Sequence, residues 1–219
     1  MSVIVFDLDG TLVDSAPDIR AAANRMLEGE GQPPLDLASV ISFIGNGLPK
    51  LVERVIEARG LNMADHARLT GITLAHYADA PADLSVAYPG MRDALRQLRD
   101  TGHILGICTN KPEAPARTLL RGMELDGYFS AVIGGDTLPK RKPDPAPLLC
   151  CFETLGARTG IFVGDSEVDA ATAQAAGAPF ALFTEGYRKS PPEALPHRAR
   201  FSDYAALPGL VDALLASTS

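Results

Sequence analysis

Four short apolar runs, each followed closely by a polar residue, recur along the chain. They cover residues 3–6, 104–108, 131–134 and 161–164. Unbroken apolar runs of this length are typical of strands that are buried on both faces of a sheet. Helical patterns lie between and after the later runs, over residues 91–100, 113–122, 144–155, 168–176 and 207–215. This alternation predicts an α/β fold with a Rossmann-like parallel sheet at its core.

The alternation is broken once, after the first apolar run. Helical patterns there cover residues 19–29, 48–60 and 64–80, with no clear strand among them. We therefore expect a small helical cap inserted over residues 14–83. The core domain is then formed by residues 1–13 and 84–219. The segment Ala80-Pro81-Ala82 is the expected hinge between the two, because proline interrupts the helical pattern there.

Composition and charge narrow the class of protein. Hydrophobic residues make up 46% of the chain and charged residues 21%, and the formal net charge is −7. This charge gives no broad attraction to nucleic acid or to an anionic membrane surface. No apolar run approaches the roughly 18 residues that a membrane span needs. The N-terminus lacks the basic region of a signal peptide, and Cys108, Cys150 and Cys151 fit no disulfide or metal spacing. A reducing, cytoplasmic location is therefore expected.

Two carboxylates, Asp7 and Asp9, follow the first apolar run in the segment Asp7-Leu8-Asp9-Gly10-Thr11. At the end of a strand both side chains can project toward the same space. Like charges this close raise a pKa or require a cation, and carboxylate oxygens are ligands that magnesium prefers. Gly10 permits the tight turn that such a segment needs. Taken alone, the segment also fits a solvated turn rich in aspartate.

This segment resembles the opening motif of the haloacid dehalogenase superfamily, Asp-x-Asp-x-Thr after a strand. The other three motifs of that superfamily are matched in the same order. Thr109 matches the Ser or Thr of the second motif, and Lys142 matches the lysine of the third. Residues 164–169, Gly-Asp-Ser-Glu-Val-Asp, match the acidic cluster of the fourth. Because the carboxyl ends of parallel strands meet at one edge of a sheet, the four motifs are expected to converge.

The resemblance implies a magnesium-dependent phosphoryl transfer. Asp7 is the expected nucleophile, which would form an aspartyl phosphate, and Asp9 is the expected acid and base. Asp7, the main-chain carbonyl of Asp9 and Asp165 are the expected ligands of Mg²⁺. Asp169 and Ser166, from the same motif, are expected to lie next to the metal ligands without being ligands themselves, with Asp169 orienting Lys142 or a metal-bound water. The alternative for Asp169 is an ordinary acid in the first turn of a helix.

Phosphate binding is expected from residues of the second and third motifs. Thr109 can donate a hydrogen bond to a phosphoryl oxygen, and Asn110 lies beside it just before a predicted helix. Lys142 would supply positive charge. Lys140 is a rival for that role, although the following Pro-Asp-Pro favours Lys142. The expected partner is a small phosphorylated metabolite, with no nucleic acid or membrane, and the chain is expected to be a monomer or a homodimer.

One segment of the predicted cap carries a further signal. Gly45, Asn46 and Gly47 precede a predicted helix, and Lys50 lies one turn into it. Free N–H groups and this cation would suit a substrate carboxylate, whereas an ordinary glycine-rich turn between helices is the alternative. With residues 109–112, 134–139 and 144–148, the segment resembles the phosphoglycolate phosphatase branch of the superfamily. That resemblance implies hydrolysis of 2-phosphoglycolate to glycolate and phosphate, within carbohydrate metabolism.

Other activities remain open on the same motifs. Superfamily members with similar motifs act on pyrophosphate, sugar phosphates or nucleotides. A phosphomutase resembling β-phosphoglucomutase would also keep Asp9 but would protect the aspartyl phosphate from water. A dehalogenase or a phosphonate hydrolase would not carry Asp9. A non-enzymatic binding module is expected to have lost part of the motif set, whereas this chain keeps Asp7, Asp9, Thr109, Lys142 and Asp165.

Overall fold

A six-stranded sheet forms the centre of the computed structural model, which describes residues 2–79 and 82–216. The strand order is β5-β4-β1-β6-β7-β8, and every neighbouring pair runs parallel. The strands are β1 (Val3–Phe6), β4 (Ile104–Cys108), β5 (Ala131–Ile133), β6 (Ile161–Gly164), β7 (Phe180–Phe183) and β8 (Ala199–Phe201). The predicted α/β class with a parallel sheet is therefore confirmed.

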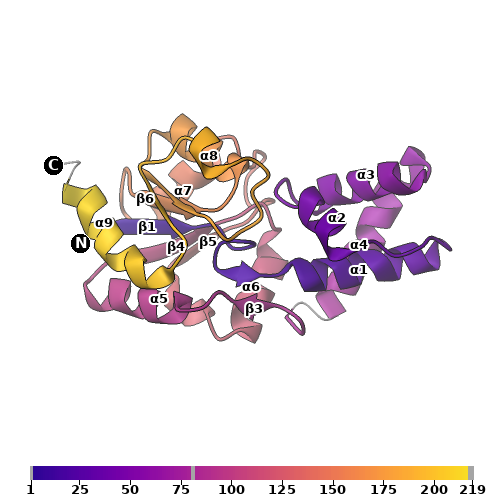
Figure 1. Ribbon diagram of the computed structural model, residues 1–219, viewed down its shortest axis with the longest axis horizontal. Helices are drawn as coiled ribbons and strands as arrows, with labels where there is room; N and C mark the ends of the chain where they lie inside the picture. Colours follow the sequence, from indigo (N-terminus) through magenta and orange to yellow (C-terminus); the bar gives the residue numbers. More distant parts are fainter. Residues whose placement is uncertain (1, 80–81, 217–219) are drawn as a thin grey trace.

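Helices cover both faces of this sheet (Figure 1). One face carries α5 (Met91–Asp100), α6 (Glu113–Gly122) and α9 (Leu207–Ala216), and the other carries α7 (Ala146–Thr154) and α8 (Glu167–Ala176). Side chains alternate along β1, so Ile4 and Phe6 join the first apolar layer while Val3 and Val5 join the second. Within the described residues, no helix is both long and apolar enough to cross a membrane.

The sheet extends two strands beyond the four that the sequence predicted. β7 has the sequence Phe-Ala-Leu-Phe and is buried throughout, so its apolar run was a usable signal. β8 has only three residues, and its central residue, Arg200, is exposed. A strand this short at a sheet edge has no periodicity to detect.

Four further helices lie together at one end of the molecule, on the right in Figure 1. We call them the helical unit: α1 (Ala16–Gly29), α2 (Leu37–Phe43), α3 (Leu48–Arg59) and α4 (His66–Asp79), the last preceded by a 3₁₀ turn at Met63–Asp65. They bury an apolar cluster of their own, which includes Met26, Val52 and Leu69. The short helix α2 was not predicted, although the side chain of Asp36 caps its N-terminus by accepting a hydrogen bond from Ser39 N.

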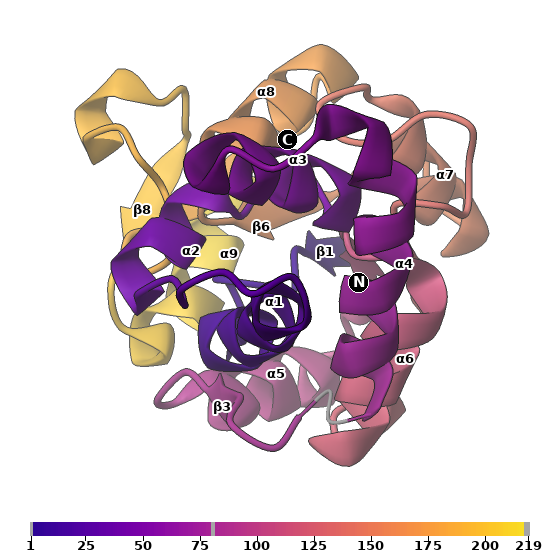
Figure 2. The ribbon, with the colours of Figure 1, turned by 90° about the vertical axis from the view of Figure 1, so that its right-hand side faces the viewer.

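Two short strands connect the helical unit to the sheet. β2 (Val13–Asp14) pairs antiparallel with β3 (Val86–Ala87), so the outgoing and returning segments lie side by side. The cap border predicted between residues 13 and 14 thus falls inside β2, and residues 80 and 81 of the predicted hinge lie outside the described residues. Figure 2, which looks onto the helical unit, shows β1 behind these helices. The helical unit therefore lies over the edge of the sheet where β1 ends.

Candidate active site

The predicted motifs converge at the edge of the sheet that faces the helical unit. Asp7 follows β1, Thr109 follows β4, and Asp165 follows β6. Two adjoining cavities open there, which we call the narrow cavity (≈ 60 Å³) and the wide cavity (≈ 270 Å³). Both are lined by Asp7, Asp9, Ile44 and Gly45. The motifs therefore surround a space that the helical unit closes from the other side.

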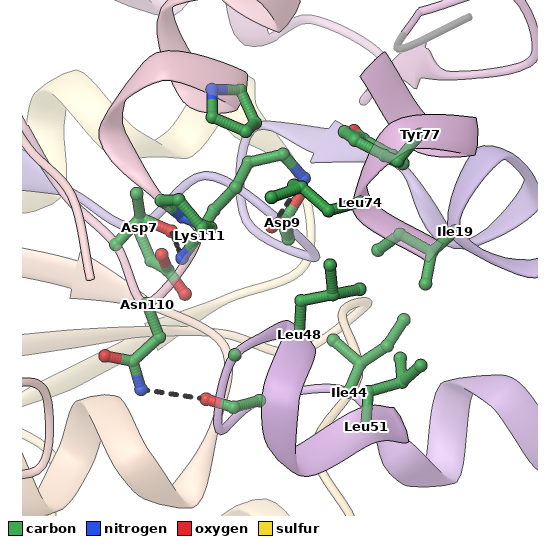
Figure 3. Close-up of a pocket in the computed structure, with 15 residues that line it drawn as sticks. Asp7, Asp9, Ile19, Ile44, Leu48, Leu51, Leu74, Tyr77, Asn110 and Lys111 are labelled. Carbon is green, nitrogen blue, oxygen red and sulfur yellow. Dashed lines mark hydrogen bonds and ion pairs between the residues drawn. The ribbon is translucent and has the colours of Figure 1, made fainter. Parts of the chain in front are cut away.

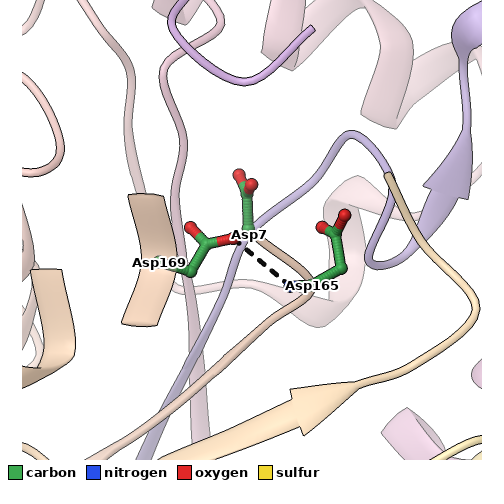
Figure 4. Close-up of side chains that lie close together, drawn as sticks. All are labelled: Asp7, Asp165 and Asp169. Atoms are coloured by element: carbon green, nitrogen blue, oxygen red, sulfur yellow. Dashed lines mark hydrogen bonds between the residues drawn. The ribbon is translucent and has the colours of Figure 1, made fainter. Parts of the chain in front are cut away.

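Three buried carboxylates form the floor of the site. Ligand atoms of Asp7, Asp165 and Asp169 lie within 4.8 Å of one another, and none of the three residues is more than 9% exposed. Figure 4 shows the carboxylates of Asp7 and Asp165 pointing to the same side. Asp165 is held by hydrogen bonds from Thr11 Oγ1 and Tyr187 N, both 2.6 Å long. Asp7 and Asp165 are therefore positioned to share a ligand.

Close packing of the carboxylates changes their ionisation. Burial raises the pKa of Asp7 to about 7 against the opposing effect of Lys142, and the charges of Asp169 and Asp9 contribute to the rise. Burial, with the charges of Asp169 and Asp7, also raises the pKa of Asp165 well above its ordinary value. A divalent cation would reverse this by favouring the ionised forms. Buried carboxylate oxygens are the donors that Mg²⁺ selects, so the residues present fit such an ion.

Lys142 lies next to Asp7, the candidate nucleophile. Its Nζ donates a 2.6 Å hydrogen bond to Asp169 Oδ1 and lies 3.0 Å from Asp7 Oδ1. Although burial opposes the charge, the pKa of Lys142 is raised because Asp169 and Asp7 surround it. The rival Lys140 has a side chain that is 69% exposed and pairs with Asp144. Lys142 is therefore the lysine that the structure brings to the site.

Asp169 both orients Lys142 and caps the N-terminus of α8, two roles that were predicted as alternatives. Its Oδ2 accepts hydrogen bonds from Ser166 N and Ser166 Oγ, while Ser166 Oγ accepts one from Asp169 N. This reciprocal capping box begins α8. The other carboxylate oxygen holds Lys142. Asp169 is thus a helix N-terminal acid that also orients the lysine, and Ser166 fixes it in place.

Asp9 points away from the carboxylate cluster toward a lysine that the sequence analysis missed. Lys111 Nζ lies 2.8 Å and 3.0 Å from the two carboxylate oxygens of Asp9, and Ser15 Oγ donates a 2.5 Å hydrogen bond to Asp9 Oδ1. The side chain of Lys111 is only 6% exposed. Burial alone would lower its pKa, but the pKa is raised because of Asp9 and Tyr77. The available signal was its position, since Lys111 directly follows Thr109 and Asn110 at a strand end.

Thr109 and Asn110 both line the narrow cavity, and Figure 3 shows Asn110 there. Thr109 is 3% exposed, and its Oγ1 accepts a hydrogen bond from Lys111 N. The side-chain amide of Asn110 donates to Lys142 O at 3.0 Å and to Gly45 O at 3.1 Å. Asn110 therefore ties the third motif to the helical unit.

The glycine-rich segment of the helical unit is held through its carbonyl groups. We call residues 43–47 the cap loop. Four successive carbonyls of this loop accept side-chain hydrogen bonds, from Arg54 to Phe43 O, Lys189 to Ile44 O, Asn110 to Gly45 O and Arg141 to Asn46 O. Three of these donors belong to the sheet and its loops rather than to the helical unit. The cap loop is therefore fastened to the core.

Lys50, in contrast, is not brought into the site. Its Nζ pairs with Glu53 at 2.5 Å, its side chain is 43% exposed, and it lines neither cavity. The prediction placed it beside Gly45, Asn46 and Gly47, of which Gly45 and Gly47 line the narrow cavity and Asn46 lines the wide one. The reason is helical geometry, because a lysine and a glutamate three residues apart meet on the outer face of α3.

Comparison with known proteins agrees with this arrangement. Residues 4–183 match the family model described as haloacid dehalogenase-like hydrolase. A protein of Cereibacter sphaeroides named phosphoglycolate phosphatase is 53% identical over 218 residues, which cover 99% of this chain and 100% of the relative. A protein of Rhodobacter capsulatus with the same name is 43% identical over 215 residues, which cover 95% of this chain and 96% of the relative.

A solved structure is also similar over nearly the whole chain. The crystal structure of a predicted phosphoglycolate phosphatase from Haemophilus somnus superposes with a TM-score of 0.90 at 30% sequence identity. The match covers 96% of this chain and 97% of that one. The resemblance inferred from the four motifs is therefore confirmed.

Proposed function

The chain belongs to the haloacid dehalogenase-like hydrolase family, and from this we propose that it is a phosphatase that hydrolyses 2-phosphoglycolate to glycolate and phosphate. The substrate is suggested by relatives up to 53% identical that are named phosphoglycolate phosphatase. The observation that carries the chemistry is the position of Asp7, which lies between Lys142 and the carboxylate of Asp165 at the floor of both cavities.

The proposed reaction has two steps, both at phosphorus. In the first, an Asp7 oxygen bonds to phosphorus while the bond from phosphorus to the ester oxygen breaks, and Asp9 donates a proton to the departing oxygen. In the second, water attacks phosphorus, Asp9 accepts its proton, and phosphate leaves Asp7. Ser15 and Lys111 hold the Asp9 carboxylate at the narrow cavity, where it can serve both steps.

Charge stabilisation is assigned to residues around the nucleophile. The phosphoryl group gathers negative charge on its oxygens, which Thr109 Oγ1 and the main-chain N–H of Asn110 would bind at the narrow cavity and Lys142 would neutralise through its place beside Asp7. Asp7 and Asp165, with the main-chain carbonyl of Asp9, would hold Mg²⁺. When bound, the ion would neutralise part of the phosphoryl charge and keep the carboxylates ionised.

The test is a phosphate-release screen in the presence of Mg²⁺. The panel contains 2-phosphoglycolate, pyrophosphate, sugar phosphates and nucleotides, and we expect the highest kcat/KM for 2-phosphoglycolate. Excess chelator should abolish release and added Mg²⁺ should restore it. Release that continues in chelator would contradict the metal requirement, and a higher kcat/KM for another member of the panel would replace the proposed substrate.

A variant tests the nucleophile itself. Asp7→Asn keeps the size of the side chain but removes the attacking oxygen, so kcat should fall by about four orders of magnitude or more. Asp93→Asn is the matched control, because the side chain of Asp93 is 78% exposed on α5, where it pairs with Arg96. Activity near the wild-type level in Asp7→Asn would remove Asp7 as nucleophile.

A further inference from the structure

The narrow cavity has one polar wall and one apolar wall. The helical unit contributes apolar side chains, namely Ile19, Ile44, Leu48, Leu51, Leu74 and Tyr77. Figure 3 shows Asp7, Asn110 and Lys111 on the left, most of the apolar residues toward the right, and Asp9 between them. Among the described residues that line this cavity, Lys111 is the sole cation. Within this cavity, Lys111 is therefore the lining side chain that can pair with a negative charge beyond the phosphoryl group.

Lys111 is held rigidly at this wall. Two contacts fix its ammonium against the oxygens of Asp9, and the ring of Tyr77 lies 4.4 Å from Nζ. An ammonium group has three N–H donors, which Asp9 and the Tyr77 side chain approach in this structure, so a substrate carboxylate would share these donors with Asp9 and displace Tyr77 from the third. Low solvent access strengthens every charge interaction that it makes. The group is therefore a preorganised anion ligand rather than a solvated lysine.

The position of Lys111 beside Asp9 determines which part of the substrate this lysine can reach. In the proposed reaction Asp9 faces the ester oxygen of the phosphate, and in 2-phosphoglycolate the carboxylate is separated from that oxygen by a single methylene group. A group bound to Asp9 is thus close to whatever lies one methylene beyond the ester oxygen. Burying a carboxylate against leucine and isoleucine side chains is unfavourable unless a cation pairs with it.

We propose that Lys111 binds the carboxylate of the substrate and sets the preference for small phosphorylated acids over neutral phosphomonoesters. This inference rests on the proposed phosphatase activity and deepens it. The Tyr77 ring, which α4 places over the ammonium, closes the subsite from the helical unit. The carboxylate then lies between Lys111 and the apolar wall, with the phosphoryl group at Asp7.

Other lysines fit this role less well. Lys142 is 1% exposed at its side chain, lines neither cavity, and is surrounded by Asp7 and Asp169. Lys50 is paired with Glu53 outside both cavities. Lys189 lines the wide cavity and donates to Ile44 O, and it does not line the narrow cavity that holds the apolar wall. Lys50 and Lys189 are nevertheless the alternative candidates for binding the carboxylate, so variants of both are included in the experiment.

The experiment compares two substrates of equal size on four variants. The substrates are 2-phosphoglycolate and its carboxamide analogue, which lacks the charge. The variants are Lys111→Gln, Lys111→Arg, Lys50→Gln and Lys189→Gln, with Lys140→Gln as the control for removal of an exposed positive charge. The quantity measured is the ratio of kcat/KM for the acid to that for the amide, in which effects common to both substrates cancel.

We expect Lys111→Gln to lower this ratio by roughly 10- to 100-fold, as for the loss of a charged hydrogen bond, and Lys111→Arg to retain part of it. The other three variants should leave the ratio within about 2-fold of wild type. A second readout uses Asp7→Asn as the background and measures binding of both compounds by calorimetry, where Lys111→Gln should weaken binding of the acid selectively. Circular dichroism and thermal melting verify that each variant is folded.

The outcomes separate this inference from the proposed function. If the wild-type protein hydrolyses 2-phosphoglycolate well but Lys111→Gln leaves both the ratio and the binding preference unchanged, the role of Lys111 is overturned and the phosphatase assignment stands. A selective loss in Lys50→Gln or Lys189→Gln instead would move the subsite to that residue. If the wild-type protein does not release phosphate from 2-phosphoglycolate, the proposed substrate fails first, and the subsite fails with it.

Discussion

The ammonium of Lys142 lies 3.0 Å from Asp7 Oδ1 in a site where the lysine side chain is 1% exposed. The same ammonium donates to Asp169, so one cation balances two buried carboxylates. Asp165, the third carboxylate of the cluster, is hydrogen-bonded to Thr11 and Tyr187 instead. The cluster therefore contains more carboxyl groups than its one lysine can balance if all are ionised, and this imbalance underlies the first three predictions.

Replacing Lys142 with methionine should both destabilise the protein and inactivate it. The substitution leaves Asp7 and Asp169 buried without their cation, which costs about 3–5 kcal/mol in the free energy of unfolding. We expect kcat to fall by about three orders of magnitude, because the positive charge beside the phosphoryl group is lost. Urea unfolding and phosphate release measure the two effects. Lys140→Met, at an exposed position, is the matched control, and equal stability of the two variants would contradict the prediction.

The stability of the metal-free protein should fall as the pH rises through the range in which Asp7 titrates. Its pKa is about 7 in the folded chain, against an ordinary value of 3.8. Between these values the folded state keeps a proton that the unfolded state has released, so the contribution is fully present below the lower value and is lost as the pH approaches the higher one. Asp7→Asn removes this titration.

Thermal melting in chelator checks this sign. Between about pH 4 and about pH 7.5, the Tm of the wild-type protein should fall relative to that of Asp7→Asn, because only the wild-type protein gains the buried charge. The comparison isolates Asp7 from other groups, since these are shared by both proteins. Parallel melting curves across this range, with a constant difference in Tm, would show that Asp7 has no raised pKa.

Magnesium should stabilise the protein through Asp165. An ion that binds only the folded state raises the Tm as its concentration exceeds the Kd. Asp165→Asn removes one proposed ligand but keeps the hydrogen-bond acceptor toward Tyr187 N. We expect the increase in Tm on adding Mg²⁺ to be lost in this variant and kept in Asp93→Asn. An undiminished increase in Asp165→Asn would place the ion elsewhere.

Much of this site could be predicted from the sequence because the ends of buried strands can be identified from it. An apolar run marks where a strand stops, and the fold sends the carboxyl ends of parallel strands to one edge. Asp7, Thr109 and Asp165 were therefore expected together, and in the structure Asp7 lines both adjoining cavities, Thr109 lines the narrow one and Asp165 lines the wide one. Lys142 is on a loop, and its position depended on the resemblance to a family motif rather than on periodicity.

The remaining features depend on side-chain directions that no pattern encodes. The contact between Lys111 and Asp9 joins residues that are 102 positions apart, and it requires the turns after β1 and β4 to face each other. Lys50 was misplaced for the opposite reason, since its partner Glu53 lies only three residues away on the outer face of α3. Local sequence favoured the exposed ion pair, whereas the prediction weighed only the neighbouring glycines.

Releasing the cap loop should weaken substrate binding more than it slows the chemistry. Arg141 and Lys189 donate to the carbonyls of Asn46 and Ile44, and neither side chain lines the narrow cavity. The double variant Arg141→Gln/Lys189→Gln should therefore raise KM about 3- to 10-fold, as for the loss of two weak hydrogen bonds, with little change in kcat. Initial rates over a range of substrate concentrations separate the two parameters.

Asn110→Ala provides the contrasting case. Asn110 holds Gly45 O as well, but it also donates to Lys142 O and lines the narrow cavity. Because this one side chain joins the cap loop to the lysine beside the nucleophile, its loss should raise KM and lower kcat together, the latter by about 10-fold or more. Arg117→Gln is the control, since Arg117 pairs with Glu113 on the exposed side of α6. If Asn110→Ala changes KM alone, as the double variant is expected to do, Asn110 fastens the loop without positioning Lys142.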